Sequence, residues 1–297
     1  MHKPPLLIGC HLSIEGGFYK AIERANELHA TCLQLFTKSN RQWQSKPISE
    51  QEAALFKQTL KESPTVQTVV AHASYLINCA AFDDAIWQKS IAGLVDELER
   101  CATLGIPYLV LHPGSAKTQD KQASITRVSQ AINEALTRIP HLKTMLLLET
   151  MAGQGSVLGA TFAEIHAIRA QVDQKKHVGA CIDTCHVFAA GYDIGTSTGY
   201  ARMKKEFDAT IGLTHLKVIH VNDSKKECGS HVDRHEHIGK GKIGIEGFAL
   251  LMNDADFFAI PKILETPKDN GLIDDRKNLE TLCHLISAAT LKKITLI

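Results

Sequence analysis

Residues 66–72, VQTVVAH, form a short apolar run that ends on a histidine, a potential metal ligand. Five more predicted strands show the same pattern, a run rich in Val, Leu and Ile that closes on His, Asp or Glu. The six strand-end residues, all of them side chains that can donate to a metal ion, are His72, His112, Glu149, Asp183, His220 and Glu265. Continuous apolar runs of this kind are typical of parallel strands that are buried on both faces.

Eight apolar runs, these six among them, alternate with amphipathic stretches along the 297-residue chain, with no linker or low-complexity segment between them. The predicted strands are 6–13, 31–36, 66–72, 107–112, 144–150, 177–183, 216–223 and 261–266. Helical patterns cover 18–30, 48–62, 83–105 with Gly105 as a stop, 123–139, a stretch from 161, a stretch from 184, a less clear one near 200–207, and 276–289. This order predicts the α/β class and a single (β/α)8 TIM barrel domain over residues 1–297. The metal site is expected at the C-terminal rim of the strands, where this fold builds its active sites.

Composition and charge narrow the functional class. Hydrophobic residues make up 44%, charged residues 22%, and the net charge is +1, so bulk charge does not indicate a dedicated nucleic-acid binder. Basic residues in three loops are either rim patches or ordinary solvated side chains: Lys38, Arg41, Lys46, Lys225, Lys226, Lys240 and Lys242. No signal peptide and no membrane-spanning run is recognised, and eight scattered cysteines indicate reduced thiols in the cytoplasm. Most of them are expected in the core, including Cys10, Cys32 and Cys181.

Three further residues join the six strand-end donors. His186 follows Asp183 by three positions, which is one helical face, and Asp233 precedes His235 in the long polar segment 222–244. Five imidazoles and four carboxylates suit Zn²⁺ or Mn²⁺ better than Mg²⁺. Nine donors exceed the needs of one ion and fit two or three, and clustered dications suit a phosphate ester as substrate.

The chain resembles the endonuclease IV family over essentially its whole length. The resemblance rests on GCHLSIEGG, VVAHASYLINCA, LVLHPGS, LLLETMAGQGS, GACIDTCHVFAAGYD, IHVNDSKKECGSHVDRHEHIGKGKIG and KILETP, in this order along the chain. The family consists of zinc-dependent apurinic/apyrimidinic endonucleases on a (β/α)8 barrel. The resemblance therefore implies a base excision repair enzyme whose partner is double-stranded DNA with abasic sites.

The resemblance also implies roles for the nine donors. Three Zn²⁺ ions per chain are expected, with Mn²⁺ possible in one or more sites. The implied ligand sets are His72 and His112 with bridging Glu149, then Glu149 with Asp183, His220 and Glu265, and finally His186, Asp233 and His235. A hydroxide between the two metals that Glu149 bridges would attack the phosphate 5′ to the abasic site, giving a 3′-hydroxyl and a 5′-deoxyribose phosphate. Glu149 and Glu265 are the predicted catalytic residues.

Two loops match the DNA-contacting loops of the family. FTKSNRQW at 36–43 places Arg41 in the minor groove, and ASYLIN at 73–78 assigns Tyr75 and Leu76 as wedges in the base stack. The chain departs from the family pattern after the bridging glutamate, where Thr150 and Met151 replace an Asn–Thr pair found in some members. Nothing in the sequence demands a dimer, so a monomer is expected.

Two other functions are consistent with parts of the pattern. A divalent-metal sugar isomerase or epimerase on a similar barrel would use Glu149, Asp183, His220 and Glu265 but would leave the other five donors without a role. A non-catalytic module that binds damaged DNA would hold structural zinc, which is usually bound by cysteines. His11, outside the implied ligand sets, is expected to touch the ligands or the substrate, and the histidines at 231 and 237 are interpreted as loop residues.

Overall fold

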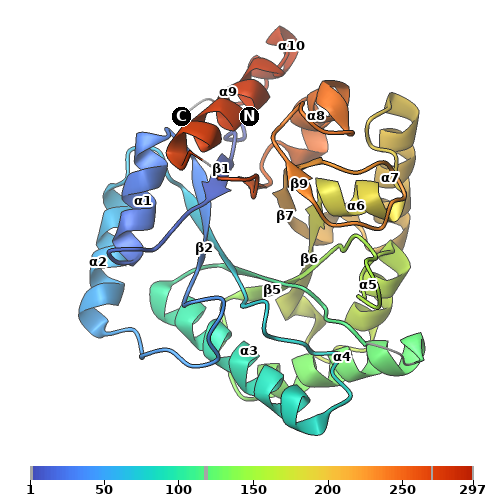
Figure 1. The fold of residues 1–297 in the computed structure, drawn as a ribbon. Coiled ribbons are helices and arrows are strands. Elements are labelled where there is room, and N and C mark those ends of the chain that lie inside the picture. Colours follow the sequence, from blue (N-terminus) through green and yellow to red (C-terminus); the bar gives the residue numbers. More distant parts are fainter. Residues whose placement is uncertain (1–2, 117–119, 269, 296–297) are drawn as a thin grey trace.

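Eight parallel strands close into a barrel, with helices around the outside (Figure 1). The computed structural model describes residues 3–116, 120–268 and 270–295, so positions 1–2, 117–119, 269 and 296–297 of the predicted domain lie outside the described residues. The barrel strands are β1 (Ile8–His11), β2 (Cys32–Phe36), β3 (Thr68–His72), β4 (Tyr108–Leu111), β5 (Met145–Glu149), β6 (Val178–Asp183), β7 (Leu216–His220) and β10 (Lys262–Leu264). Their hydrogen-bonded order is β1-β10-β7-β6-β5-β4-β3-β2, and every pairing within the barrel is parallel. The predicted α/β class and (β/α)8 barrel are confirmed.

The helices follow the predicted order around the strands. They are α1 (Phe18–Glu27), α2 (Glu50–Glu62), α3 (Asp84–Leu104), α4 (Lys121–Thr137), α5 (Phe162–Ala170), α6 (Thr184–Ala190), α7 (Ser197–Thr210), α8 (Gly244–Met252), α9 (Leu272–His284) and α10 (Ala288–Leu291). Three short 3-10 helices are η1 (Lys175–His177), η2 (Leu213–His215) and η3 (Ala255–Phe257). Gly105 ends α3 in the left-handed conformation, with φ of 76°, as its position predicted.

The C-terminal helix was wrongly predicted as one element over 276–289. Helix α9 begins four residues earlier and ends at His284, because Asp274 and Asp275 favour its first turn and Gly271 adopts a φ of 60° just before it. Ser287 then caps the separate helix α10 by accepting a hydrogen bond from the Thr290 amide. Helix α8 and the antiparallel pair β8 (Asp223–Ser224) and β9 (His235–Glu236) were not predicted.

A small inner core inside the barrel positions the functional residues. Each strand, or the residue just before it, contributes one buried side chain to this core: Leu7, Cys32, Val70, Val110, Leu147, Cys181, Val218 and Ile263. Because side chains alternate along a strand, the residue two positions later also points into the barrel, one layer nearer the C-terminal rim. That next layer consists of Gly9, Gln34, His72, His112, Glu149, Asp183, His220 and Glu265. All six predicted strand-end donors therefore lie in one layer above the apolar core.

The larger core lies between the strands and the helices, and the chain ends meet beside it. The segments near the two termini pair through a bridge between Pro5 and Thr295, close to α9 (Figure 1). Cys10, Cys32 and Cys181 are buried, as predicted, and none of the cysteines in the described part of the chain forms a disulfide. Within the described residues, none of the helices combines the length and the apolarity that a membrane crossing requires.

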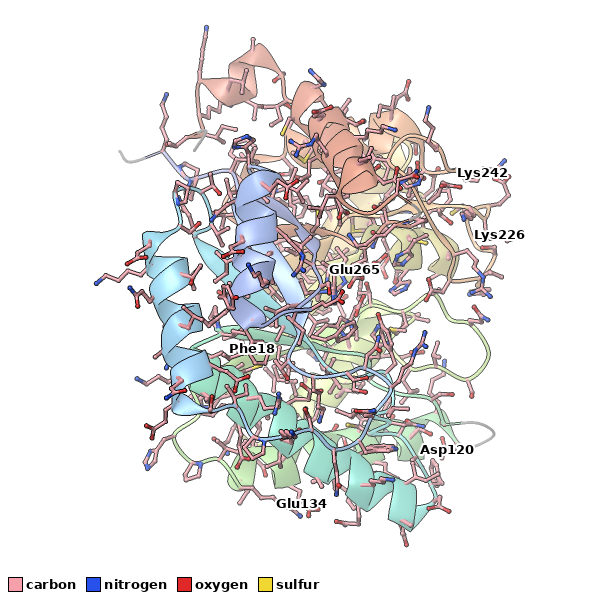
Figure 2. All side chains as sticks on the ribbon, turned by 60° about the vertical axis from the view of Figure 1, so that its left-hand side comes forward. Phe18, Asp120, Glu134, Lys226, Lys242 and Glu265 are labelled. Carbon is pink, nitrogen blue, oxygen red and sulfur yellow. The ribbon has the colours of Figure 1, made fainter. Side chains whose placement is uncertain are left out.

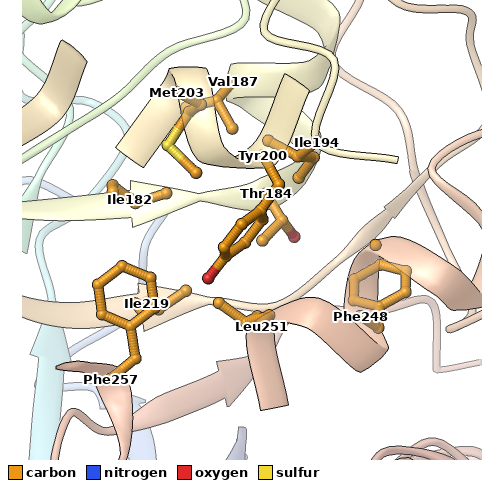
Figure 3. Close-up of a pocket in the computed structure, with 11 residues that line it drawn as sticks. Ile182, Thr184, Val187, Ile194, Tyr200, Met203, Ile219, Phe248, Leu251 and Phe257 are labelled. Atoms are coloured by element: carbon orange, nitrogen blue, oxygen red, sulfur yellow. The ribbon is translucent and has the colours of Figure 1, made fainter. Parts of the chain in front are cut away.

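An enclosed cavity lies between β6, β7 and helices α6, α7 and α8 (Figure 3). Its volume is about 10 Å³, and its walls are mainly apolar side chains such as Ile182, Met203 and Phe248. The Tyr200 hydroxyl at its edge already donates a hydrogen bond to Asp254. A space that holds about one water molecule is too small for a substrate.

Candidate metal centre

The first group of donors surrounds one oxygen of Glu149. Glu149 Oε2 lies 3.2 Å from His72 Nε2 and 3.0 Å from His112 Nε2. The other ring nitrogen of His72 lies 2.7 Å from the Ala73 carbonyl oxygen, which accepts its proton. His72 Nε2 is therefore the ring nitrogen that faces the carboxylate and that would offer its lone pair to a bound cation. Ligand atoms of the three residues lie within 4.8 Å of one another.

The second group surrounds the other oxygen of the same carboxylate. His220 Nδ1 lies 2.9 Å from Glu149 Oε1, 3.2 Å from Glu265 Oε2 and 3.9 Å from Asp183 Oδ2. His220 Nε2 points the opposite way and donates to the amide oxygen of Gln34 at 2.8 Å. The two oxygens of Glu149 thus face two different groups, as a bridging ligand requires.

The third group joins the start of α6 to the loop after β7. Asp183 is the N-cap of α6 and accepts the backbone N–H of His186, which fixes the predicted three-residue spacing. His186 Nε2 lies 3.2 Å from Asp233 Oδ2, and His235 Nε2 lies 3.4 Å from Asp233 Oδ1. Cys185 was not foreseen here, yet its sulfur lies within 4.8 Å of ligand atoms of Asp233 and His235.

Two nitrogens in the third group carry the strongest indication of a cation. In the described part of the chain, the buried side-chain N and O atoms without a hydrogen-bond partner are His186 Nε2, His235 Nε2 and Ser230 Oγ. The opposite ring nitrogens are occupied, since His186 Nδ1 lies 2.9 Å from the Thr150 carbonyl and His235 Nδ1 lies 3.0 Å from the Glu265 carbonyl. Buried polar atoms normally have partners, and a dication would use both lone pairs at once. The donor set therefore fits bound metal.

The pKa shifts within the layer of donors also agree with a cation site. Burial by itself would raise the pKa of Glu149, but His220 and His112 outweigh it and hold that pKa well below its usual range. Burial opposes a charged imidazole at His186, yet Asp183 and the other neighbouring carboxylates raise the pKa of His186 well above its usual value. Protons on the imidazoles thus balance the carboxylates, and dications would balance the same charge through the lone pairs.

Residues that sequence reasoning missed hold the donors in place. Gln34 is fully buried, and besides accepting from His220 it donates to Glu265 Oε1 at 2.6 Å and contacts His11 at 2.9 Å. Asn222 donates to Asp183 Oδ2 at 2.7 Å and accepts from the Glu265 amide at 2.7 Å. Both residues belong to strands or strand ends already recognised, but a neutral amide gives no metal signal in a sequence.

Asp223 organises the loop that supplies Asp233 and His235. Its carboxylate accepts backbone hydrogen bonds from Gly239, Gly241 and Ile243 at 2.9–3.0 Å. Pairing of β8 with β9 places Ser224 opposite His235. The Asp223 carboxylate therefore joins the beginning of the polar segment 222–244 to its end.

Residues outside the donor set lie as follows. His11 Nδ1 is 3.4 Å from Glu265 Oε1, in agreement with the predicted contact to a ligand. The Thr150 hydroxyl accepts the Asp183 amide at 3.0 Å, so the departure at positions 150 and 151 keeps a hydrogen bond to the site. His231 contacts the Ala152 carbonyl, and the ring of His237 contacts Asn278.

The loop residues divide into exposed and buried ones. Arg41 and Tyr75 are exposed and Leu76 is half-buried. The Tyr75 ring lies 5.3 Å from the His72 ring and 5.4 Å from the His112 ring, so it covers one side of the first group. The prediction that Lys38 belongs to a basic rim patch or is an ordinary solvated lysine is wrong. Its side chain is buried and paired with Asp96 and Glu97, so it contributes no charge to the rim.

The other basic residues are on the surface. Lys46, Lys225, Lys226, Lys240 and Lys242 are exposed. Figure 2 shows Lys226 and Lys242 at the outer edge of the loop after β7, away from Glu265 near the centre of the view. Lys242 is paired with Glu227 at 2.8 Å. Lys226 and Lys242 are therefore interpreted as ordinary solvated lysines.

Comparisons with known proteins agree with the geometry. A family model described as a xylose isomerase-like TIM barrel matches residues 22–287. The probable endonuclease 4 of Chloroflexus aurantiacus is 46% identical over 281 residues, 95% of this chain and 98% of the relative. That of Geobacter sulfurreducens is 44% identical over 288 residues, 97% of each chain.

Solved structures show the same likeness. Endonuclease IV from Thermus thermophilus is 35% identical, with a TM-score of 0.84 over 94% of this chain and 98% of that chain. A D-tagatose 3-epimerase-like protein is 19% identical, with a TM-score of 0.73 over 94% of this chain and 97% of that chain, which shows a shared fold alone. With sequence identity above 40% to several relatives over nearly the whole length, the chain belongs to the endonuclease IV family of xylose isomerase-like TIM barrels.

Proposed function

We propose that the chain hydrolyses the phosphodiester 5′ to an abasic site in double-stranded DNA, leaving a 3′-hydroxyl and a 5′-deoxyribose phosphate. As a member of the endonuclease IV family, it is an endonuclease of DNA repair. The proposal includes a monomer that acts as one domain over residues 1–297 in the cytoplasm, where its cysteines stay reduced.

Three zinc ions are the proposed cofactors, with Mn²⁺ as an alternative occupant. His72 and His112 would hold the first and His220, Asp183 and Glu265 the second, with Glu149 shared between them. His186, Asp233 and His235 would hold the third. When bound, such ions supply Lewis acidity toward phosphate oxygens and activate a water molecule near neutral pH.

The protein's own residues have distinct tasks in this proposal. Glu149 and Glu265 are the proposed catalytic carboxylates, because Glu149 is fully buried between the first two groups and Glu265 Oε2 lies 3.2 Å from His220, which also contacts Glu149. Gln34 and His11 keep Glu265 in one orientation through contacts of 2.6 Å and 3.4 Å. Tyr75 lies against the histidine rings and would limit water access when DNA is bound.

The exposed loop residues are assigned to the duplex. Arg41 would enter the minor groove, and Tyr75 with Leu76 would wedge into the base stack. An abasic nucleotide has lost its base pair and its stacking, so extruding it costs less than extruding a normal nucleotide. This cost difference supports selectivity for the damaged site.

The observation that carries the proposal is the pair His186 Nε2 and His235 Nε2, which are buried without a hydrogen bond although Asp233 oxygens lie 3.2 and 3.4 Å away. A sugar isomerase would be served by Glu149, Asp183, His220 and Glu265, and would have no use for His186, Asp233 and His235. A non-catalytic zinc module would bind its ions mainly through cysteine, whereas this site consists mainly of imidazoles and carboxylates. Both alternatives leave the barrel mouth unexplained.

The test is incision of a duplex oligonucleotide with one tetrahydrofuran abasic analogue, in the presence of EDTA, with metal content measured on the same preparation. The analogue blocks β-elimination, so a lyase cannot cut it. We expect cleavage to a 3′-hydroxyl over many turnovers and about three metal ions per chain. Absence of cleavage by fully metal-loaded protein would favour the sugar isomerase, while cleavage limited to one event per protein would favour the binding module.

A further inference from the structure

Two rim loops, residues 37–48 and 73–82, rest on the same face of α3. Lys89, Gly93, Glu97 and Arg100 are spaced by four, four and three residues, which places them along one side of the helix. The Lys89 ammonium lies 4.7 Å from the centre of the Trp43 ring in the first loop. A Cβ atom at Gly93 would lie 3.3 Å from Ile77 of the second loop and 3.7 Å from Trp43, so glycine lets both loops approach the helix.

Glu97 is the point at which the two loops share one side chain. It is 1% exposed, and its two oxygens are divided between the loops. Oε2 accepts the Thr37 hydroxyl at 2.5 Å, and Oε1 accepts the Ser74 backbone N–H at 3.2 Å. The Lys38 ammonium lies 3.7 Å from Oε1 and balances the buried charge.

Further contacts fix the loops to each other and to the helix. The Ser74 hydroxyl donates to the Asn40 carbonyl at 2.9 Å, which joins the loops directly. Arg100 donates to the Thr37 carbonyl from Nε at 3.0 Å, and to the Lys46 carbonyl from Nη1 at 2.9 Å. The guanidinium thus holds the first loop at both of its ends.

We infer that Glu97 is a positioning residue that makes the two rim loops act as one rigid clamp on the damaged duplex. The inference rests on the proposed function, in which Arg41 of the first loop and Tyr75 of the second contact DNA. Arg41 lies four residues after Thr37, and Tyr75 directly follows Ser74, so both DNA-contacting side chains start close to Glu97 partners. Glu97 belongs to none of the donor groups of the metal centre.

Fixing the loops in advance serves binding. Two independent loops would each lose conformational freedom when DNA binds, and that loss would weaken affinity. Loops that are already held on one helix face present Arg41 and Tyr75 at a constant separation, with less left to order on binding. The contribution of Arg41 should therefore depend on Glu97, although 56 positions separate the two residues in the sequence.

The experiment uses the full chain with bound metal in a Trp87→Phe background. The chain contains two tryptophans, so Trp43 becomes the single fluorescent reporter of the first loop. Glu97→Gln keeps the side-chain size but removes the charge and one of the two carboxylate acceptors. Glu99→Gln is the matched control, because Glu99 lies on the same helix and is exposed.

We expect Glu97→Gln to raise KM for the abasic duplex about tenfold, with kcat and metal content near those of the parent. Acrylamide quenching of Trp43 should increase without DNA. Arg41→Ala and Tyr75→Ala should each cost less in the Glu97→Gln background than in the parent, because the clamp is already loosened. A residue that only stabilises the fold would not change that coupling.

Strictly additive effects of Arg41→Ala and Tyr75→Ala, with unchanged quenching of Trp43, would overturn the inference. If Glu97→Gln does not fold, Thr37→Val and Ser74→Ala each remove one hydroxyl from the network and undergo the same tests. A parent protein that neither binds nor cuts the abasic duplex would refute the proposed function instead. The Trp43 quenching comparison would then decide by itself whether Glu97 fixes the loop.

Discussion

Two buried polar clusters lie at the same rim of this barrel, and they differ in what satisfies them. Around Glu97, the carboxylate has donors on both oxygens and a lysine beside it. Around Glu149, imidazoles and carboxylates face one another, and two ring nitrogens in the adjoining group have no hydrogen-bond partner. Glu97 and Glu149 are both buried glutamates, so the groups around each carboxylate, and not its burial, distinguish the two clusters.

The comparison shows how a buried polar cluster that stabilises local structure differs from one that can bind a further group. A cluster that supplies all its own hydrogen bonds fixes local geometry, because each group has exchanged water for a protein partner. A cluster in which buried ring nitrogens lack a hydrogen bond needs a further group to complete it. On this criterion the Glu149 region is prepared for cations, and the Glu97 region is prepared to hold loops.

Of the four substitutions, Glu149→Gln should have the largest effect, which is on incision. We expect incision of the abasic duplex to fall by about a thousandfold, because several kcal/mol of transition-state stabilisation depend on ions held by this carboxylate. The barrel should stay folded, as judged by circular dichroism. The exposed Glu62→Gln is the control, and near-normal incision by Glu149→Gln would remove the shared role of that residue.

Lys38→Met tests the cluster around Glu97, whose polar groups have partners within the protein. Removing the ammonium leaves the Glu97 carboxylate buried without its charge partner, and we expect a loss of about 3 kcal/mol in the free energy of unfolding, measured in denaturant on metal-loaded protein. Lys46→Met, on the same loop but exposed, should change that free energy by less than about 0.5 kcal/mol. Equal free energies of unfolding for the two variants would show that the Lys38 ammonium does not stabilise the buried Glu97 carboxylate.

Asn222→Ala tests whether hydrogen bonds around the donors matter as much as the donors' positions. The amide bonds both Asp183 and the Glu265 backbone, so we expect metal affinity to fall about tenfold to a hundredfold in competition with a chromogenic chelator. Asn253→Ala is a suitable control, since that amide bonds the Ala249 and Leu285 carbonyls instead. Unchanged zinc release would show that the donors keep their geometry without Asn222.

Arg41→Ala should have the smallest effect, confined to DNA affinity. We expect the slope of log affinity against log salt concentration to decrease by about one unit, measured by fluorescence anisotropy over a salt series. Lys38→Met should leave the slope unchanged because its charge is buried. An unaltered slope in Arg41→Ala would mean that Arg41 makes no phosphate contact.

The strand-end donors were predictable because side chains alternate along a strand and because parallel strands end at the same rim. His72, His112 and Glu149 each stand two residues after a side chain of the inner core, so the alternation that buries Val70, Val110 and Leu147 also turns the donors into the barrel. Parallel strands then bring all these ends to one rim. The pair Asp183 and His186 followed for a similar local reason, since an N-cap and the third residue of the helix are neighbours.

The alternation of strands and helices, the layer of donors and the burial of most cysteines could be predicted from the amino-acid order, because each depends on local periodicity along one strand or helix. The tertiary fold is what buries Lys38, since Asp96 and Glu97 come from a helix about sixty positions away. It also decided that Gln34 and Asn222 hold the donors and that Asp223 fixes the loop with Asp233 and His235. Neutral amides and distant partners leave no periodic signal, so only the folded chain shows which polar groups are already satisfied and which still require a cation.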